Sequence, residues 1–306
     1  MIYLDCQSTT PLAPEARDAM LMWLGGPESE SYGNPHSAHR MGRMAAAAVE
    51  HAREQVAALF PPGGRVIFTG SATEALNLAL LGSGACRPAV SAIEHAAVLD
   101  PVEWGFDGTV LPVDREGLVD PDTPFPEGTD MVAVMQVNNE IGTIQPVVCL
   151  AERAHRVGAL FLCDAVQGAG KLAPPAGADM IAVSAHKLYG PKGIGALWVR
   201  DGVQLQPLIR GGGQEQGLRS GTLSPALCAG FGAAAGLALA RMEADRDHVD
   251  KLWDKAVELF AGWTVNGSVT QRWHGNLNVR HDGLDVARLM SDLRGVAFSA
   301  GSACAS

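Results

Sequence analysis

Short apolar runs alternate with helical stretches in the middle of this sequence, between about residues 65 and 200. Five of the runs are rich in apolar and β-branched residues, and they predict strands at 65–69, 131–136, 159–163, 180–183 and 196–200. Residues 73–81 and 148–157 repeat their apolar positions at helical spacing. Strands that alternate with helices are typical of an α/β domain with a mostly parallel sheet.

The pattern changes after this region. Three consecutive glycines at 211–213 predict a flexible loop, and residues 226–246, which are rich in Ala and Leu, predict one long helix. A charged helix in the region that begins near residue 240, a strand at 276–280 and a helix at 284–293 are predicted beyond it. This shift in composition indicates a second structural unit near the end of the chain.

The length of 306 residues, with 47% hydrophobic and 18% charged residues, allows a large buried core and excludes a disordered or fibrous chain. We expect a large domain over residues 13–238 and a smaller α/β domain made of residues 1–12 and 239–306. The alternative that length alone leaves open is one continuous domain.

The charge balance limits the range of partners. Lys and Arg total 23 against 33 Asp and Glu, a formal net charge of -10. Direct DNA binding is not expected, because contact with nucleic-acid phosphates needs a basic face. The sequence shows no apolar run of about 18 residues or more, and it opens without the basic and apolar regions of a signal peptide. We expect a cytoplasmic protein with no membrane partner.

Six cysteines are scattered singly along the chain: Cys6, Cys86, Cys149, Cys163, Cys228 and Cys304. They form no CxxC pair and no Cys/His cluster at zinc-ligand spacing, so no metal site is expected. Most of these thiols are expected to be reduced, buried and unreactive.

Polar residues follow the predicted strands at the ends where open α/β sheets bind ligands. They are Ser71 and Thr73, Asn138 and Asn139, Asp164 and Gln167, and residues 184–187. Residues 66–74 run from a strand through a glycine turn into a helix start, where free amides and the positive helix end can bind phosphate. An ordinary N-cap by Ser71 or Thr73 is the alternative. No Walker A motif is present, so a nucleoside triphosphate is not implied.

Asp164 and Lys187 each follow an apolar run. A carboxylate at the position of Asp164 is costly to bury unless a cation neutralises it, and a protonated pyridine nitrogen would do so. A lysine that is desolvated at the position of Lys187 becomes a Schiff-base nucleophile. The alternative for Lys187 is a solvated side chain at the end of a strand.

Three motifs occur in order: SAHKLYGPKGIG at 184–195, GGGQEQGLRSGT at 211–222 and SAGSACAS at 299–306. Together with residues 33–37 and 94–95, they resemble the IscS/NifS group of cysteine desulfurases, within the class V aminotransferases of pyridoxal-phosphate fold type I. The resemblance covers nearly the whole chain. It implies a large domain with a mostly parallel sheet plus a smaller α/β domain, and pyridoxal 5'-phosphate as the cofactor.

The resemblance implies a role for each matching residue around the cofactor ring. Lys187 would hold the cofactor as a Schiff base, and Asp164 would pair with the ring nitrogen. His95 would stack on the ring and transfer protons. Gln167 would donate a hydrogen bond to the phenolic oxygen, and Asn139 would lie near that oxygen and the substrate.

The resemblance also implies that two subunits bind the cofactor phosphate. Ala72, Thr73, Ser184 and His186 match phosphate ligands of the family. Thr222 matches a residue that reaches the phosphate of a neighbouring subunit. The implied assembly is therefore a homodimer.

Cys304 distinguishes the IscS/NifS group from plain aminotransferases. The resemblance implies that L-cysteine is converted to L-alanine and that its sulfur is transferred to Cys304 as a persulfide. An acceptor protein would then receive the sulfur. The acceptor would be an iron-sulfur scaffold protein, for cluster assembly, or a protein of tRNA thiolation. Small residues around Cys304 favour a mobile loop that carries the thiol. The alternatives are a selenocysteine lyase, another class V aminotransferase, and a non-catalytic relative of the fold.

Two segments depart from the family pattern. Residues 5–10 replace a stretch that is usually rich in Asn, and Cys6 within them could be mistaken for a functional thiol. Family members continue beyond the position of Cys304 with a strand, helices and an Arg that binds the substrate carboxylate. We therefore expect the native protein to be longer than this chain, and otherwise expect Asn139 or Arg219 to hold the carboxylate.

Overall fold

The computed structural model describes residues 1–301, so Cys304 lies outside the described residues. Its centre is a seven-stranded sheet in the order β2-β8-β7-β6-β5-β3-β4. The strands are β2 (Gly64–Thr69), β3 (Pro88–Ser91), β4 (Thr109–Leu111), β5 (Met131–Ala133), β6 (Leu160–Asp164), β7 (Met180–Ser184) and β8 (Gly195–Arg200). β8 is antiparallel to both neighbours, and the other neighbouring pairs are parallel. The predicted α/β fold with a mostly parallel sheet is confirmed.

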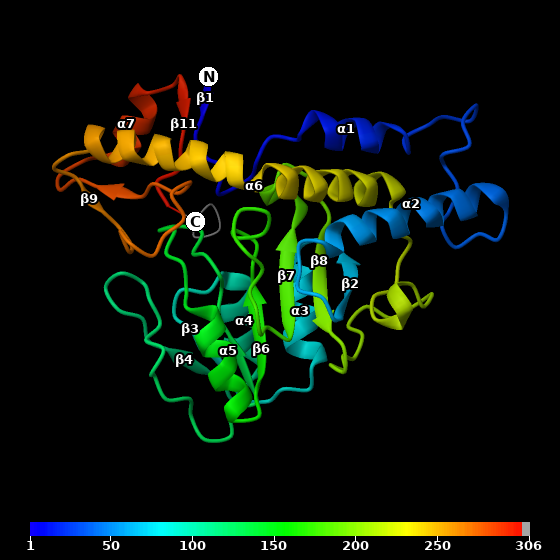
Figure 1. Ribbon diagram of the computed structural model, residues 1–306, viewed down its shortest axis with the longest axis horizontal. Coiled ribbons are helices and arrows are strands. Elements are labelled where there is room, and N and C mark those ends of the chain that lie inside the picture. The colour runs from blue at the N-terminus through cyan, green and yellow to red at the C-terminus, as the bar shows by residue number, and fades with distance from the viewer. Residues whose placement is uncertain (302–306) are drawn as a thin grey trace.

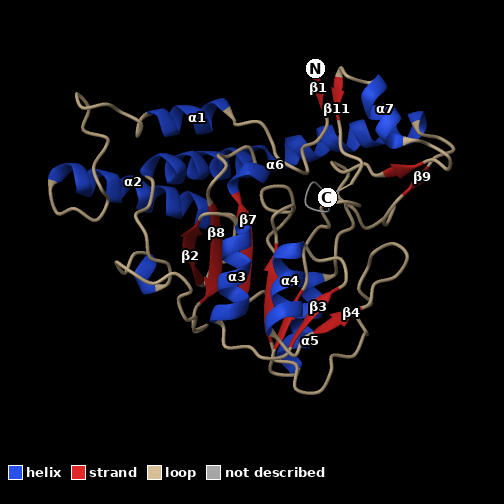
Figure 2. Ribbon diagram, turned by 180° about the vertical axis from the view of Figure 1, so that it is seen from behind, coloured by secondary structure: helices blue, strands red, loops and turns tan. Residues whose placement is uncertain are grey.

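Helices cover both faces of the sheet (Figures 1 and 2). One layer contains α2 (Arg40–Ala57), α5 (Val147–Arg156) and α6 (Pro225–Leu259), and the opposite layer contains α3 (Ala72–Gly82) and α4 (Ala96–Gly105). Within β2, Val66 and Phe68 pack in the first layer and Ile67 packs in the second. Side chains alternate across a strand, so a strand with helices on both faces is apolar at every position.

A smaller region lies beyond one end of the sheet, where the first strand of the chain lies beside the last described strand (Figure 1). β1 (Ile2–Tyr3) pairs in parallel with β11 (Val296–Ala297), and β9 (Thr264–Val265) pairs antiparallel with β10 (Val279–Arg280). The short helix α7 (Val286–Asp292) belongs to the same region. The N-terminal segment then crosses to α1 (Pro14–Leu21), which packs against α6.

The long helix α6 joins the two regions. Its length and composition alone would allow it to cross a membrane. Phe231, Ala234 and Ala235 of this helix are instead buried in the core beside α2. The buried apolar residues of the first part of α6 therefore belong to the core of the protein.

The structure also corrects several predicted elements. The regular part of β5 ends at Ala133, although Val134 and Gln136 still donate hydrogen bonds to the carbonyls of Leu162 and Asp164. β3 and β4 were not predicted, because they are short and β3 begins with a proline. α1, α2 and α4 were not predicted either, and α6 extends well past residue 246. The second half of α6 is charged and largely exposed, so its apolar periodicity is weak.

Candidate active site

The predicted site residues gather at one edge of the central sheet. The edge contains the ends of β2, β3, β5, β6 and β7 and the start of β8. Because parallel strands finish at the same edge, residues that follow different strands come together there. They are Ala72, Thr73, His95, Asn139, Asp164, Gln167, Ser184, His186 and Lys187.

Lys187 ends a single turn of 3-10 helix (Ala185–Lys187) directly after β7. Its Nζ donates hydrogen bonds to the carbonyl of Ser8, at 2.7 Å, and to the carbonyl of Gln7. Gln167 Nε2 donates to the same Gln7 carbonyl at 2.9 Å. The N-terminal segment therefore reaches the centre of the site, and Gln7 is a site residue that sequence reasoning missed. The only feature of the sequence that could have pointed to Gln7 is its position within residues 5–10, which depart from the family pattern.

Asp164 is the last residue of β6 and is 7% exposed. Its Oδ1 accepts a hydrogen bond from the Val166 amide at 2.9 Å. Burial raises the pKa of Asp164, and this rise is opposed by that hydrogen bond and by the charges of His95 and Lys187. A buried carboxylate in this position is suited to a cationic partner such as a protonated pyridine nitrogen.

The turn after β2 has the features of a phosphate site. Ser71 is the N-cap of α3, and its Oγ accepts a hydrogen bond from the Glu74 amide at 3.2 Å. The first-turn amides of Ala72 and Thr73 have no carbonyl within the helix to bond. A Cβ on Gly195 would lie 2.5 Å from the Ser71 carbonyl carbon and 2.7 Å from the Ala72 nitrogen. Only glycine therefore lets β8 approach this turn.

His186 lies beside Lys187 at the end of β7. Its Nδ1 is 3.1 Å from Thr9 Oγ1. Burial, together with the charges of Lys187 and Lys192, lowers the pKa of His186 to about 4. The imidazole is therefore neutral near pH 7, so it can contact a phosphate as a hydrogen-bond donor but not as a cation.

The loop at residues 211–222 is joined to the phosphate turn by an ion pair. Arg219 Nε lies 2.8 Å from Glu74 Oε1, and Glu74 Oε2 accepts a hydrogen bond from the Gly70 amide at 2.7 Å. Arg219 thus has a carboxylate partner within the protein. Thr222, three residues further on, is exposed. The ion pair of Arg219 with Glu74 could not be predicted from the sequence, because residues 211–222 and 66–74 are far apart in it.

His95 and Glu94 follow β3. His95 is the N-cap of α4, and its Nδ1 accepts a hydrogen bond from the Ala97 amide at 3.0 Å, which leaves Nε2 to carry the proton in the neutral ring. Glu94 Oε1 accepts hydrogen bonds from Ser91 Oγ, at 2.5 Å, and from the Met135 amide, at 2.7 Å. Burial raises the pKa of Glu94 to about 8. Glu94 was predicted only as part of a motif.

Cys6 and Lys171 lie near Lys187. Burial and the charge of Lys187 lower the pKa of Lys171 to about 8. Burial raises the pKa of the Cys6 thiol, although the charge of Lys171 opposes this rise. A thiol with a raised pKa is a weak nucleophile at neutral pH, so Cys6 is poorly suited to accept sulfur.

Among residues 1–301, no three His, Cys, Asp or Glu side chains gather as metal ligands.

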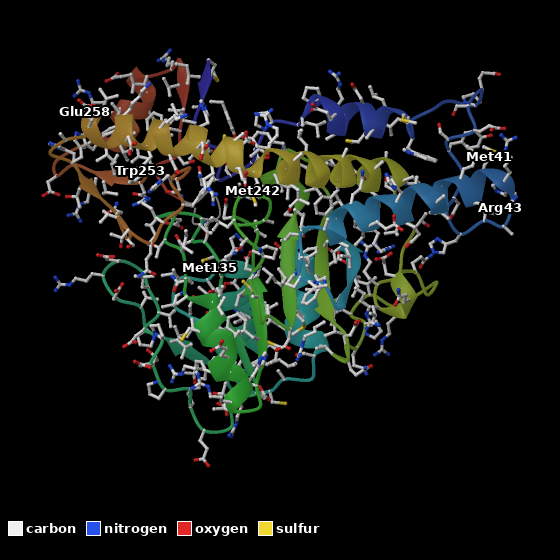
Figure 3. All side chains as sticks on the ribbon, viewed as in Figure 1. Met41, Arg43, Met135, Met242, Trp253 and Glu258 are labelled. Carbon is white, nitrogen blue, oxygen red and sulfur yellow. The ribbon has the colours of Figure 1, made fainter. Side chains whose placement is uncertain are left out.

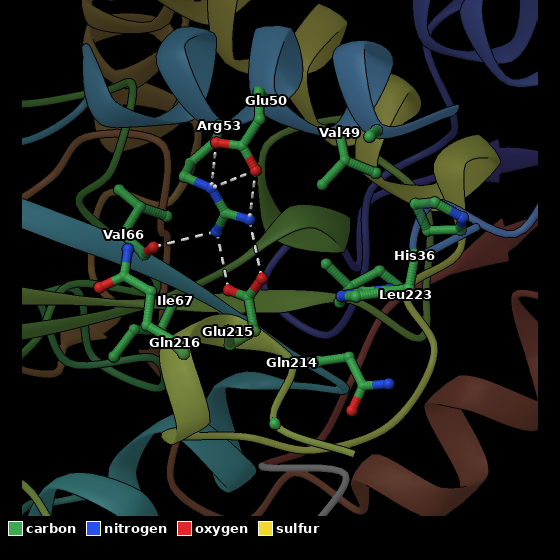
Figure 4. Close-up of a pocket in the computed structure, with 13 residues that line it drawn as sticks. His36, Val49, Glu50, Arg53, Val66, Ile67, Gln214, Glu215, Gln216 and Leu223 are labelled. Carbon is green, nitrogen blue, oxygen red and sulfur yellow. Dashed lines mark hydrogen bonds and ion pairs between the residues drawn. The ribbon is translucent and has the colours of Figure 1, made fainter. Parts of the chain in front are cut away.

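A separate pocket of about 210 Å³ brings together two of the sequence motifs, residues 33–37 and 211–222 (Figure 4). Arg53 spans its wall and forms a bidentate ion pair with Glu215, with both nitrogen–oxygen distances at 2.7 Å. Glu215 also accepts a hydrogen bond from the Phe68 amide at 2.6 Å. Glu215 has φ 48°, an unusual conformation for a bulky residue, and this buried network holds it there.

These residues fit pyridoxal phosphate. Lys187 would supply an amine for its aldehyde, and Asp164 would supply a buried carboxylate for its ring nitrogen. The N-terminus of α3 supplies amides for its phosphate.

Comparison with known proteins supports the same assignment. The family described as aminotransferase class-V matches residues 2–306. The mitosomal cysteine desulfurase of Encephalitozoon cuniculi (strain GB-M1) is 42% identical over all of this chain and 76% of its own length. The cysteine desulfurase IscS of Rickettsia rickettsii (strain Iowa) is 39% identical over all of this chain and 79% of its own length.

Solved structures are similar as well. A NifS-like protein, 32% identical, matches 96% of this chain and 85% of its own with a TM-score of 0.89. A structure described as SspA in complex with cysteine, also 32% identical, matches 99% of this chain and 90% of its own with a TM-score of 0.85. The chain therefore belongs to the class V aminotransferase family.

Proposed function

We propose that this protein is a pyridoxal-phosphate-dependent cysteine desulfurase that converts L-cysteine to L-alanine and transfers the sulfur to Cys304 as a persulfide. The observation that carries the proposal is the placement of Lys187 and the buried Asp164 at the ends of adjacent strands, β7 and β6. The relatives named cysteine desulfurase support the choice of substrate.

The reaction assigns a separate task to each group around the ring. Pyridoxal phosphate supplies an electron sink that acidifies the Cα–H bond of a bound amino acid. Lys187 would hold the cofactor and would accept the Cα proton of the bound amino acid at Nζ. Asp164 would pair with the ring nitrogen, and Gln167 and Asn139 would bind the phenolic oxygen. His95 would contact the ring and transfer protons through Nε2.

The phosphate is held by the turn before α3 and by the end of β7. Ala72 and Thr73 donate from the helix N-terminus, and Ser184 and His186 donate from the neighbouring strand. Thr222 binds the phosphate of a second copy, so we propose a homodimer. The exposure of Thr222 in a single chain supports this assignment.

Sulfur leaves the substrate by transfer to a thiolate. The Cys304 sulfur attacks the substrate sulfur, the bond from that sulfur to Cβ breaks, and its electron pair returns to the carbon skeleton that becomes L-alanine. The persulfide is then delivered to an acceptor protein such as an iron-sulfur scaffold or a tRNA-thiolation protein. We propose a cytoplasmic location, although the relatives include proteins named mitosomal and mitochondrial.

We also propose that the chain is divided into a large and a small domain. Residues 13–238 form the large cofactor-binding domain, and residues 1–12 and 239–306 form the small domain. The pairing of β1 with β11 supports the grouping of the two chain ends.

The sulfur-transfer step can be tested by peptide mass spectrometry. The purified protein, loaded with pyridoxal phosphate, is exposed briefly to L-cysteine and digested without reductant. We expect one added sulfur atom on the peptide containing Cys304, and the same result in Cys6→Ala. Added sulfur confined to the Cys6 peptide would contradict the assignment of Cys304.

A further inference from the structure

Arg272 is a buried arginine held by backbone carbonyls. It is 5% exposed. Its Nη1 donates to the carbonyls of Asn266, at 3.3 Å, and Ser268, at 3.0 Å. Its Nη2 donates to the carbonyls of Ile141 and Asn276, both at 3.0 Å. Among the described residues, no carboxylate forms an ion pair with it.

The guanidinium also lies over the ring of Trp253 on α6, 4.3 Å from the ring centroid (Figure 3 labels Trp253). Trp253 stacks on His274 at a centroid distance of 4.9 Å. Burial lowers the pKa of Arg272 to about 10, which leaves it charged at neutral pH. A buried cation without a carboxylate costs free energy, and the hydrogen bonds to four carbonyls offset part of that cost.

The carbonyl of Ile141 connects Arg272 to the turn that carries Asn139. The same turn is held at two further points, because Asn276 Nδ2 donates to the Asn139 carbonyl at 3.1 Å and the Trp273 amide donates to the Gly142 carbonyl at 2.9 Å. Gly142 has φ 72°, and a Cβ there would lie 2.9 Å from the Asn276 Cβ. Residues 272–276 therefore fix the backbone at Asn139 and at the residues that follow it, up to Gly142.

The same segment reaches the cofactor lysine by a second route. Gln7 Nε2 donates to the Gly275 carbonyl at 2.6 Å. The Gln7 carbonyl in turn accepts hydrogen bonds from Lys187 Nζ and Gln167 Nε2. One segment thus supports Asn139 on one side of the site and the partners of Lys187 on the other.

We propose that Arg272 is a positioning residue for the amino-acid substrate: it fixes residues 266–276, and through them the turn carrying Asn139 and the contact to Gln7. This inference rests on the proposed function. Asp164, Ser184 and the phosphate turn belong to the central sheet and its helices, and no hydrogen bond joins them to Arg272 among the described residues. The proposed contacts to the phosphate and to the ring nitrogen therefore lie outside the Arg272 network, whereas Asn139, which we place beside the substrate, depends on it.

The test compares Arg272→Met, Arg272→Lys and the control Arg280→Met. Arg280 lies in the same region, is 63% exposed and pairs only at the surface with Asp282. For Arg272→Met we expect kcat/KM for L-cysteine to fall on the order of 10-fold to 100-fold, mainly through KM, because small misplacements of positioning groups cost rates of this size. Affinity for pyridoxal phosphate, measured by absorbance titration, is expected to change less than about 2-fold. Arg272→Lys should recover part of the loss, and Arg280→Met should match the wild type.

A second readout does not depend on turnover. In the cofactor-free protein, amide hydrogen exchange over residues 138–142 should accelerate in Arg272→Met and in the milder Asn276→Ala, while exchange in α5 stays unchanged. If Arg272→Met does not fold, the KM for L-cysteine and the amide exchange of residues 138–142 in Asn276→Ala test the proposal instead. A folded Arg272→Met with unchanged KM and unchanged exchange would overturn the proposal, as would equal losses of cofactor affinity and turnover in both variants. If the wild type forms no L-alanine from L-cysteine, the proposed function is wrong. The hydrogen-exchange measurement then still tests whether Arg272 fixes residues 138–142.

Discussion

Arg219 Nε and Glu74 Oε1 lie 2.8 Å apart, and this ion pair joins the loop at residues 211–222 to the turn that precedes α3. The two side chains are 20% and 22% exposed, so solvent screens the pair only in part. Glu74 also accepts a hydrogen bond from the Gly70 amide, so the pair links Arg219 to the turn that we propose binds phosphate. It also removes Arg219 as a ready partner for a substrate carboxylate.

Glu74→Gln is expected to weaken the binding of pyridoxal phosphate by about 10-fold. The substitution keeps the shape but leaves Arg219 without its charged partner, a loss typically worth about 1.5–3 kcal/mol. Absorbance titration of the cofactor-free protein measures the change. Asp18→Asn, which breaks the exposed pair of Arg17 and Asp18, serves as the control and should have no effect. Equal affinities for Glu74→Gln and the wild type would show that the pair does not support the phosphate turn.

Lys187→Ala is expected to abolish turnover and the absorbance of the cofactor bound to lysine. Within residues 1–301, no other amine lies at the end of β7 and beside Asp164. Borohydride reduction of the wild type followed by peptide mapping should locate the cofactor on Lys187. A label on Lys171 or Lys192 would show that the wrong lysine has been assigned.

Asp164→Asn is expected to lower kcat on the order of 10²-fold or more while the cofactor stays bound. The substitution removes the charge that we propose keeps the ring nitrogen protonated, in a buried site where such charges contribute most. Steady-state kinetics and the cofactor absorbance measure the two effects separately. Near-normal turnover would make Asp164 a structural residue.

Glu94→Gln is expected to change how stability depends on pH. Burial raises the pKa of Glu94 from its usual 4.5 to about 8, so between these values the folded protein retains a proton that the unfolded chain releases. This group therefore makes stability fall as pH rises from about 4.5 to about 8. Urea unfolding of the cofactor-free protein across that range should show a flatter profile for Glu94→Gln than for the wild type. Parallel profiles would mean that Glu94 is ionised in the folded state.

Cys304→Ser should still bind pyridoxal phosphate and L-cysteine but release almost no sulfide, because a hydroxyl cannot accept sulfur. The spectral change on addition of L-cysteine reports binding, and a sulfide assay reports transfer. Sulfide release at the wild-type rate would exclude Cys304 as the acceptor. Cys6→Ser is the matched control and should behave like the wild type.

The fold and the centre of the site could be predicted from the sequence for a physical reason. Strands with helices on both faces read as apolar runs, and the polar residues that follow them, such as Asp164 and Ser184, meet because parallel strands end together. Gln7, Glu74 and Arg272 could not be assigned in this way. Their partners lie far away in the sequence, and their hydrogen bonds depend on packing between segments that no local pattern encodes. β3 and α4 were missed because each contains a proline.

The most direct test of the central claim is the stoichiometry of products from L-cysteine. The purified protein, loaded with pyridoxal phosphate, is incubated with L-cysteine and a thiol reductant, and L-alanine and sulfide are both quantified over time. We predict equal amounts of the two products from the wild type and neither from Lys187→Ala. Loss of L-cysteine without L-alanine, or L-alanine formation that persists in Lys187→Ala, would contradict the assignment of this protein as a cysteine desulfurase.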